Sequence, residues 1–297
     1  MIVFLALYAC GGDGTKASPV SVDDMCKTFD YGDDDASDDA KAGLERTNCY
    51  RRLMGLDAAE LEPHLDIAAQ KHAEYMATNN TLTHEEDKDA DGYTGESVWD
   101  RADTAGYDLA YTTVMSHVVS QGYGPEAAVD GWMNSVYHRI PFTVPNVAGT
   151  GFGQQDRYSS MAFVTDYTSE SAAAVLYPVD GQIDVPPSFN SDFEEPDPAP
   201  GASYVGPPIT VTVSSKTAPG SDTNPFVLEL VDASLSGPDG DVELITLTPD
   251  TDEYVFQAIA LVPSETLQPD ADYDVSVDVT WTGGEQTLSA TFHTASE

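Results

Sequence analysis

The chain has 297 residues, and 41% of them are hydrophobic, which is enough for the cores of two ordinary domains. It carries 12 Lys and Arg residues against 51 Asp and Glu residues, a formal net charge of -39. A surface this acidic repels phosphate groups, so we expect neither nucleic acid nor anionic lipid as the main partner.

The N-terminus predicts an exported protein with a lipid anchor. Residues 1–9 are apolar but too short to span a bilayer. The run Leu7-Tyr8-Ala9-Cys10 resembles a lipobox, in which Cys10 is lipidated and becomes the first mature residue. Residues 1–10 would then be a lipoprotein signal region, and Cys10 would anchor the protein to a membrane in the cell envelope or outside the cell. An ordinary signal peptide or a chance apolar start is the alternative.

Residues 11–40 are rich in Asp, Gly and Ser, which is typical of a flexible acidic tether. The remaining cysteines are Cys26, within this tether, and Cys49. A disulfide between them would join the tether to the first helix, as export permits, and two free thiols are the alternative. No pair of cysteines has the CxxC spacing of a zinc or redox motif.

The spacing of apolar residues divides the remainder of the chain into three regions. Residues 41–172 predict helices around a small sheet, because apolar residues recur at helical spacing over 38–56 and 59–79. Strands are expected over 147–154 and 160–167. Residues 173–206 are rich in proline and predict a stiff, extended connector. Residues 207–297 alternate apolar and polar side chains, which is typical of a β-sandwich.

Several motifs, in the expected order, resemble the bacterial CAP superfamily, also called SCP-like. They are Arg46-Thr47-Asn48, residues 69–76, Leu82-Thr83-His84, Ala105-Gly106-Tyr107 and residues 131–139, which end in His138-Arg139. The resemblance covers about residues 40 to 170 and implies an α+β fold, a three-layer α-β-α sandwich. Weaker likenesses, Tyr177-Pro178-Val179-Asp180-Gly181 and Phe292-His293-Thr294, resemble an all-β immunoglobulin-like sandwich after it.

The CAP resemblance also implies a cleft. In the family two histidines, here His84 and His138, are paired with two glutamates, but in this chain His117 and Ser135 stand at the glutamate positions. Three imidazoles could hold zinc or another divalent metal with water as the fourth ligand. The alternative is that His84, His117 and His138 only form hydrogen bonds in the cleft, so no cofactor is certain.

The leading interpretation is an exported, surface-anchored CAP-domain lipoprotein that binds a ligand or partner through a histidine-lined cleft. The partner would be an envelope or extracellular ligand that the sequence does not identify. The alternative is a metal-dependent hydrolase acting on peptide or cell-envelope polymers, and a third is a purely structural envelope component. No serine-nucleophile motif is present, and we lean away from an efficient enzyme.

Overall fold

The computed structural model describes residues 17–27, 36–109, 113–122, 124–166, 173–214 and 226–296. The expected lipobox with Cys10 lies outside these residues. Within them, no helix is both long enough and apolar enough to cross a membrane.

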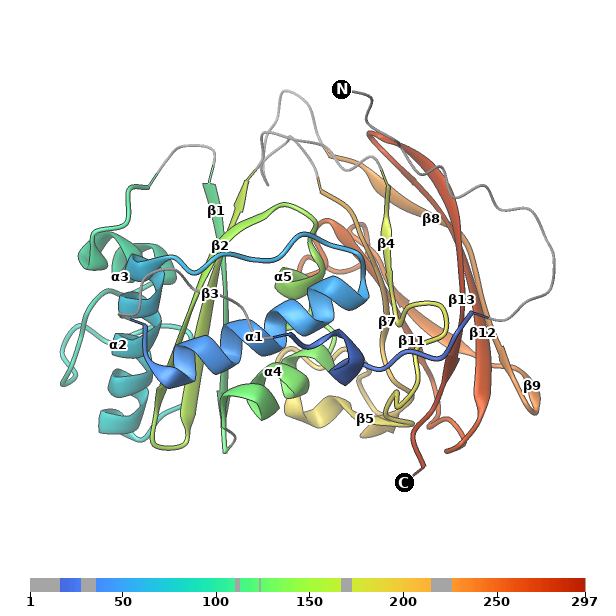
Figure 1. Ribbon diagram of the computed structural model, residues 1–297, viewed down its shortest axis with the longest axis horizontal. Helices are drawn as coiled ribbons and strands as arrows, with labels where there is room; N and C mark the ends of the chain where they lie inside the picture. The colour runs from blue at the N-terminus through green and yellow to red at the C-terminus, as the bar shows by residue number, and fades with distance from the viewer. Residues whose placement is uncertain are drawn as a thin grey trace.

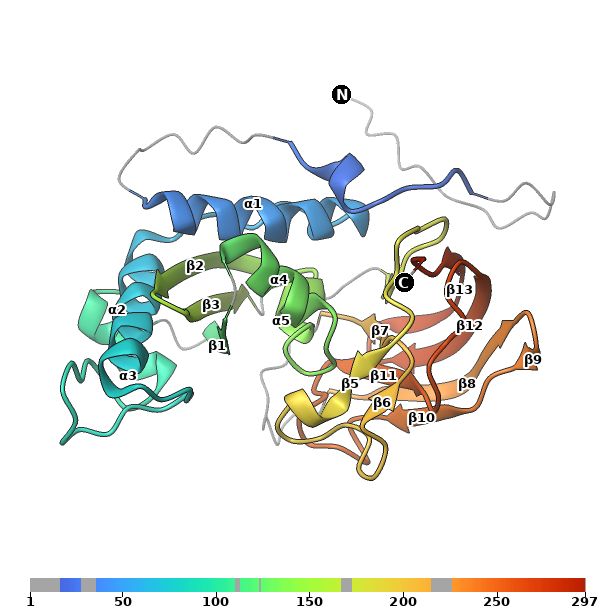
Figure 2. The same ribbon diagram turned by 90° about the horizontal axis from the view of Figure 1, so that it is seen from below.

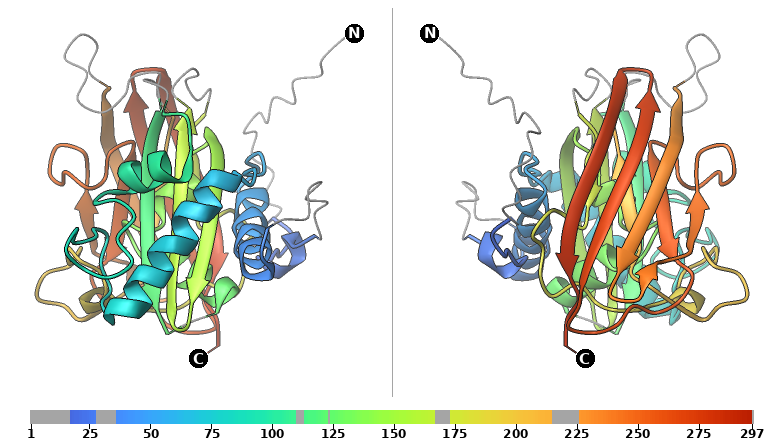
Figure 3. Two further views of the ribbon diagram at one scale, coloured as in Figure 1. Left: turned by 90° about the vertical axis from the view of Figure 1, so that its left-hand side faces the viewer. Right: turned by 90° about the vertical axis from the view of Figure 1, so that its right-hand side faces the viewer.

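The N-terminal half is built around an antiparallel sheet with the strand order β1-β3-β2. Its strands are β1 (Thr113–Gln121), β2 (Val147–Gln155) and β3 (Tyr158–Asp166). Helices α2 (Pro63–Asn79) and α3 (Val98–Ala105) cover one face, and α1 (Asp38–Leu53) and α4 (Pro125–Met133) lie on the other (Figure 1). The left view of Figure 3 shows α2 crossing the sheet. This is the α-β-α layering expected for a CAP-like α+β fold.

Small residues on β2 allow α2 to approach the sheet closely. A Cβ added at Gly151 would lie 2.1 Å from the backbone of Leu65, and one at Gly153 would lie 2.2 Å from the backbone of Gln70. Phe152, between these glycines, faces the other way and packs in the core with Tyr50 and Trp132. The strand period of two therefore places the two helical layers on opposite faces.

The C-terminal half is all-β and contains two four-stranded sheets, which share one apolar core. One sheet has the order β10-β11-β7-β4 and the other the order β13-β12-β8-β9. Their strands are β4 (Val175–Tyr177), β7 (Ile209–Thr212), β8 (Leu228–Gly237), β9 (Gly240–Asp241), β10 (Leu244–Leu247), β11 (Ala258–Pro263), β12 (Asp272–Trp281) and β13 (Gly284–His293). The right view of Figure 3 shows β8, β12 and β13 on the outer side.

The sheet β10-β11-β7-β4, here called the inner sheet, has central strands, β7 and β11, that are buried on both faces. Ile209 and Ile259 point into the core between the two sheets, whereas Ala260 and Val262 pack with Val136 of the CAP-like half. Helix α5 (Ile140–Thr143) lies between the N-terminal sheet and β7 (Figure 2). All six residues of β11 are buried for this reason, so it lacks the apolar alternation of a half-exposed strand.

The segment 173–206 differs from the extended connector that we expected. It supplies β4 to the inner sheet and forms a small hairpin, β5 (Phe189–Asn190) with β6 (Tyr204–Val205), and a short 3-10 helix, η2 (Ser191–Phe193). Tyr177 packs in the CAP-like core, and Ala199 packs in the core between the halves. Proline-rich composition predicted stiffness, but the apolar side chains between the prolines fold the segment against both halves.

The expected tether over residues 11–40 also contains ordered structure. Residues 17–27 include the 3-10 helix η1 (Asp23–Met25) and a bridge between Val20 and Gln182. Cys26 and Cys49 form a disulfide that joins this stretch to α1. Part of the tether is therefore fixed against α1 and the loop that contains Gln182.

Candidate functional site

A cavity of about 390 Å³ lies where the two halves meet. The CAP-like wall includes the three expected histidines, His84, His117 and His138. The opposite wall comes from the loop before β11 and includes Tyr254, Phe256 and Gln257, and the segment 173–206 contributes Glu195 and Pro196. The volume lies within the range of about 300–1,000 Å³ that is usual for small-molecule sites.

The three histidines come from separate elements and converge at this cavity. His84 follows α2 in a loop, His117 is in the middle of β1, and His138 lies in the turn after α4. The Nδ1 atoms of His84 and His117 are 3.3 Å apart. The rings of His84 and His138 are stacked with their centroids 6.4 Å apart. The three side chains therefore line one cavity.

His117 is held in a neutral form by its surroundings. Its Nε2 lies 3.0 Å from Oγ of Ser160, and its Nδ1 lies 3.5 Å from the guanidinium of Arg101. Burial lowers the pKa of His117 well below 6.5, and the charge of Arg101 acts in the same direction. Because the guanidinium can only donate, it assigns Nδ1 of His117 as an acceptor and Nε2 as the protonated nitrogen.

His84 lies at the mouth of the cavity and is more exposed. Partial burial of its ring lowers its pKa, and the positive charge of Arg101 acts in the same direction. With His117 Nδ1 as an acceptor, the contact between the two rings requires the proton on Nδ1 of His84. Both residues therefore enter a ligand-binding reaction as neutral imidazoles.

A buried ionic network of Glu86, His72 and Arg101 lies behind His117. Glu86, 3% exposed, accepts a hydrogen bond from Nδ1 of His72 at 2.9 Å and one from the backbone N–H of Thr94 at 2.6 Å. Burial alone would raise the pKa of Glu86, but these hydrogen bonds and Arg101 outweigh it and lower the pKa. The ring of His72 packs edge-on to His117 with centroids 5.0 Å apart. The network fixes the position of His117.

The structure supplies a carboxylate that sequence reasoning missed. Glu194, whose side chain is 1% exposed, accepts a hydrogen bond from Nδ1 of His138 at 2.8 Å. It also accepts bonds from the backbone N–H groups of Val136, Tyr137 and His138 at 2.7, 2.7 and 3.0 Å. The proton on Nδ1 leaves Nε2 of His138 as an acceptor. Glu194 lies 56 residues after His138, in a stretch with no motif, so no local signal could have identified it.

Gln257 is the second residue that the sequence did not indicate. It is 3% exposed, and its side-chain Nε2 has no hydrogen-bond partner among the described residues. Its backbone has a φ of 60°, in the left-handed region that residues other than glycine rarely adopt. A buried amide donor without an acceptor is uncommon in folded proteins.

The metal interpretation rests on His84 and His117. Two nitrogens bound to one tetrahedral zinc at about 2.0–2.1 Å are about 3.3 Å apart, which matches their Nδ1 atoms. However, Arg101 occupies the space beside Nδ1 of His117, and Glu194 already engages Nδ1 of His138. Over the described ranges, no group of three or more His, Cys, Asp or Glu residues is arranged to hold a metal. Metal binding stays a prediction.

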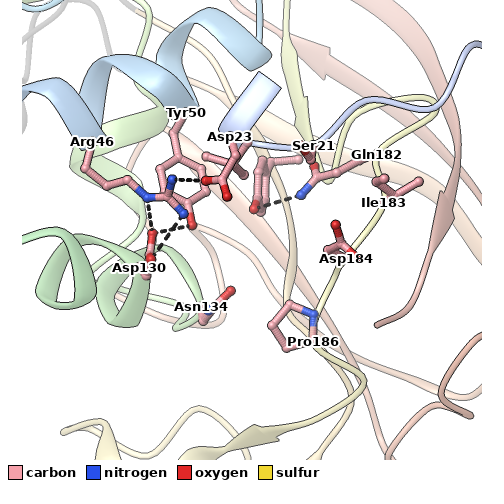
Figure 4. A pocket seen from close by; sticks show the side chains of 12 residues that line it. Ser21, Asp23, Arg46, Tyr50, Asp130, Asn134, Gln182, Ile183, Asp184 and Pro186 are labelled. Carbon is pink, nitrogen blue, oxygen red and sulfur yellow. Dashed lines mark hydrogen bonds and ion pairs between the residues drawn. The ribbon is translucent and has the colours of Figure 1, made fainter. Parts of the chain in front are cut away.

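A second cavity, of about 200 Å³, lies between α1, α4 and the N-terminal segment (Figure 4). Arg46 bonds to Asp130 through Nε at 2.5 Å and to Asp23 at 2.5 Å, and the Tyr50 hydroxyl donates to Asp130 at 2.9 Å. Gln182, on the opposite side, donates to the Tyr177 hydroxyl at 3.0 Å. These polar groups bind one another, and the bond between Arg46 and Asp23 helps to hold the N-terminal segment against α1.

Comparison with known proteins identifies the N-terminal half. Residues 44–167 match the model of the CAP, or cysteine-rich secretory protein, family. An extracellular SCP-domain protein from Bacillus anthracis is similar over 43% of this chain and 40% of that chain, with 20% identity and a TM-score of 0.39. An outer surface protein from Borrelia burgdorferi is similar over 45% of this chain and 96% of that chain, with 18% identity and a TM-score of 0.37. No curated protein matches. The histidines of the cavity thus lie in a stretch of chain, residues 44–167, that is a CAP (SCP) domain.

Proposed function

We propose that this protein is an exported, envelope-anchored binding module that holds a ligand in its histidine-lined cavity. The observation that carries the proposal is the composition of that cavity, in which the CAP domain provides His84, His117 and His138 and the β region provides Tyr254 and Gln257. A mostly apolar cleft with a few convergent polar groups is the usual form of a binding site.

The proposed location rests on three features. Cys10 follows an apolar start and would carry the lipid anchor. The disulfide between Cys26 and Cys49 suits an oxidising compartment. The CAP family model describes secretory proteins. The β region, which we interpret as immunoglobulin-like, would complete the binding site as well as space it from other surfaces.

Anchoring is tested by substituting the expected lipidated residue. Cys10→Ser should move the protein from the membrane fraction to the soluble exported fraction or leave its signal uncleaved. A protein that partitions identically with and without Cys10 would refute the anchor and leave the cavity proposal intact.

The binding function is tested by filling the cavity. Val114 lines it from β1, so Val114→Trp should block it, whereas Val231→Trp changes a valine that is 63% exposed on β8. A set of uncharged small molecules is screened by saturation-transfer NMR against both variants, after thermal melts show that both are folded. We expect binding to be lost in Val114→Trp and kept in Val231→Trp. Binding that survives in both variants, or no binding at millimolar concentration, would overturn the proposal.

Hydrolysis is the second candidate, and the pair of Glu194 and His138 favours it. A carboxylate that holds the Nδ1 proton of a histidine and leaves Nε2 free is the arrangement of a general base. A metal-dependent hydrolase would also use His84 and His117, whose Nδ1 atoms have the separation of zinc ligands. This candidate predicts turnover of peptide or envelope polymers that Glu194→Gln abolishes. Turnover that is unchanged in Glu194→Gln would contradict it.

A further inference from the structure

We propose that the cavity binds one uncharged, apolar residue of a peptide, and that Gln257 and His138, on opposite walls, form hydrogen bonds with one of its two peptide groups. The proposal rests on the binding function above and names the ligand class. It follows from the hydrogen-bonding groups left unused in the cavity and from the apolar lining around them.

Gln257 provides the first unused group. Its side chain lies at the cavity, is 3% exposed, and has an amide nitrogen with no partner among the described residues. The backbone carbonyl of the same residue accepts a bond from the backbone N–H of Val213 at 3.1 Å, which holds the loop in place. A turn of the side-chain torsions on ligand binding would bring the buried nitrogen to the cavity. A ligand carbonyl is the acceptor that would satisfy this donor.

His138 provides the second group, on the opposite wall. Its Nδ1 proton goes to Glu194, so its Nε2 is an acceptor that makes no hydrogen bond to a described residue. A peptide group carries an N–H and a C=O that point in opposite directions in one plane. Its N–H therefore suits the imidazole of His138 while its C=O suits the amide of Gln257.

Most of the remaining lining is apolar, and its charged member, the carboxylate of Glu195, disfavours an anionic ligand. Phe256, Ile140, Pro141 and Val144 line the cavity, as does Tyr254, whose ring packs on Tyr137 with centroids 5.7 Å apart. A sugar would bury several hydroxyls against these groups without partners, at a cost for each.

The size of the cavity sets the size of the ligand. About 390 Å³ is at the small end of ligand pockets, which span about 300–1,000 Å³. This volume suits one residue of a chain with its two flanking peptide groups. We therefore take N-acetyl-L-leucine methylamide, an uncharged capped residue, as the probe.

The experiment compares the dissociation constant of this probe for the full chain and two matched variants. Gln257→Asn shortens the side chain and keeps a residue type that tolerates positive φ, so the fold is retained. Gln155→Asn makes the same change in β2, outside the cavity lining. We expect Gln257→Asn to weaken binding about tenfold, which corresponds to about 1.4 kcal/mol, and Gln155→Asn to have no effect. An ester analogue of the probe, with oxygen in place of the N–H that faces His138, should also bind about tenfold more weakly.

The outcomes distinguish failure of the peptide assignment alone from failure of the binding function. An equal affinity in Gln257→Asn and wild type, or equal losses in both Gln variants, would overturn the role of Gln257. If N-acetylglucosamine binds and the capped leucine does not, and Val114→Trp removes that binding, the peptide assignment fails while the binding function stands. If neither compound nor any member of the wider screen binds, both proposals fail together.

Discussion

Removal of the Glu194 carboxylate should destabilise the whole protein and separate its two halves. The side chain is 1% exposed and accepts four hydrogen bonds from residues 136–138, which lie in the turn after α4. Glu194 itself belongs to the segment that leads into the β region. Glu194→Ala therefore removes the acceptor that joins the CAP domain to this segment.

The expected loss of stability follows from the four hydrogen-bond donors that Glu194→Ala leaves without their acceptor. Each buried donor left without an acceptor costs about 1–3 kcal/mol, so four give an upper limit of about 4–12 kcal/mol. Water entering the emptied space will rehydrate part of the site, because the side chain of His138 is already 19% exposed. Because of this rehydration we expect Glu194→Ala to cost about 3–5 kcal/mol, near the lower end of that limit.

Urea unfolding followed by tryptophan fluorescence and circular dichroism measures this loss. Glu195→Ala is the matched control, because the neighbouring glutamate is exposed and should change stability by less than about 0.5 kcal/mol. We also expect the variant Glu194→Ala to unfold in two transitions, one for each half. A loss below about 1 kcal/mol, or equal losses in both variants, would refute the structural role assigned to Glu194.

Three further predictions concern pH, the disulfide and metal. The pKa values of His84 and His117 are lower in the folded protein than their usual 6.5, so the unfolded chain binds more protons below that pH and stability should fall between pH 7 and pH 5.5. His117→Gln should flatten this dependence in urea titrations, and identical slopes would contradict it. Cys26 and Cys49 close a loop with a sequence separation of 23, so Cys26→Ser with Cys49→Ser should cost about 3 kcal/mol by chain entropy, and an unchanged unfolding midpoint would argue against the bond. If His84 and His117 bind zinc, a hundredfold excess over its dissociation constant should stabilise the wild type by about 2.7 kcal/mol but not His84→Ala, and a melting temperature indifferent to zinc would reject the metal.

Local patterns in the sequence predicted several elements well. The helix expected over 59–79 is α2, and its start is fixed by Pro63 in the first turn and by the Glu62 side chain, which accepts a hydrogen bond from the backbone N–H of Leu65. The alternation over 273–281 became β12, whose apolar residues are buried at every second position. Such elements depend on residues a few positions apart, so their signals lie within one short window.

Other elements could not be predicted in this way. The strand β11 is a run of buried residues without alternation, because the CAP domain covers one of its faces and the outer sheet covers the other. The prolines of residues 173–206 predicted an extended connector. In the structure Tyr177 and Ala199 pack this segment against both halves. The residues that cover β11 and the segment 173–206 are distant in the sequence, so a short window of sequence does not contain them.

The sequence by itself determined the CAP domain, the all-β character of the second half and the three histidines of the cavity. The order of the CAP motifs predicted the first, the alternation of apolar and polar residues predicted the second, and the resemblance to the family singled out the histidines. Only the tertiary structure decided that Glu194 and Gln257 belong to the same cavity. Glu194 and Gln257 each lie more than fifty positions from His138, with which they share this site. Contacts between residues so far apart in the chain leave no periodic pattern in the sequence.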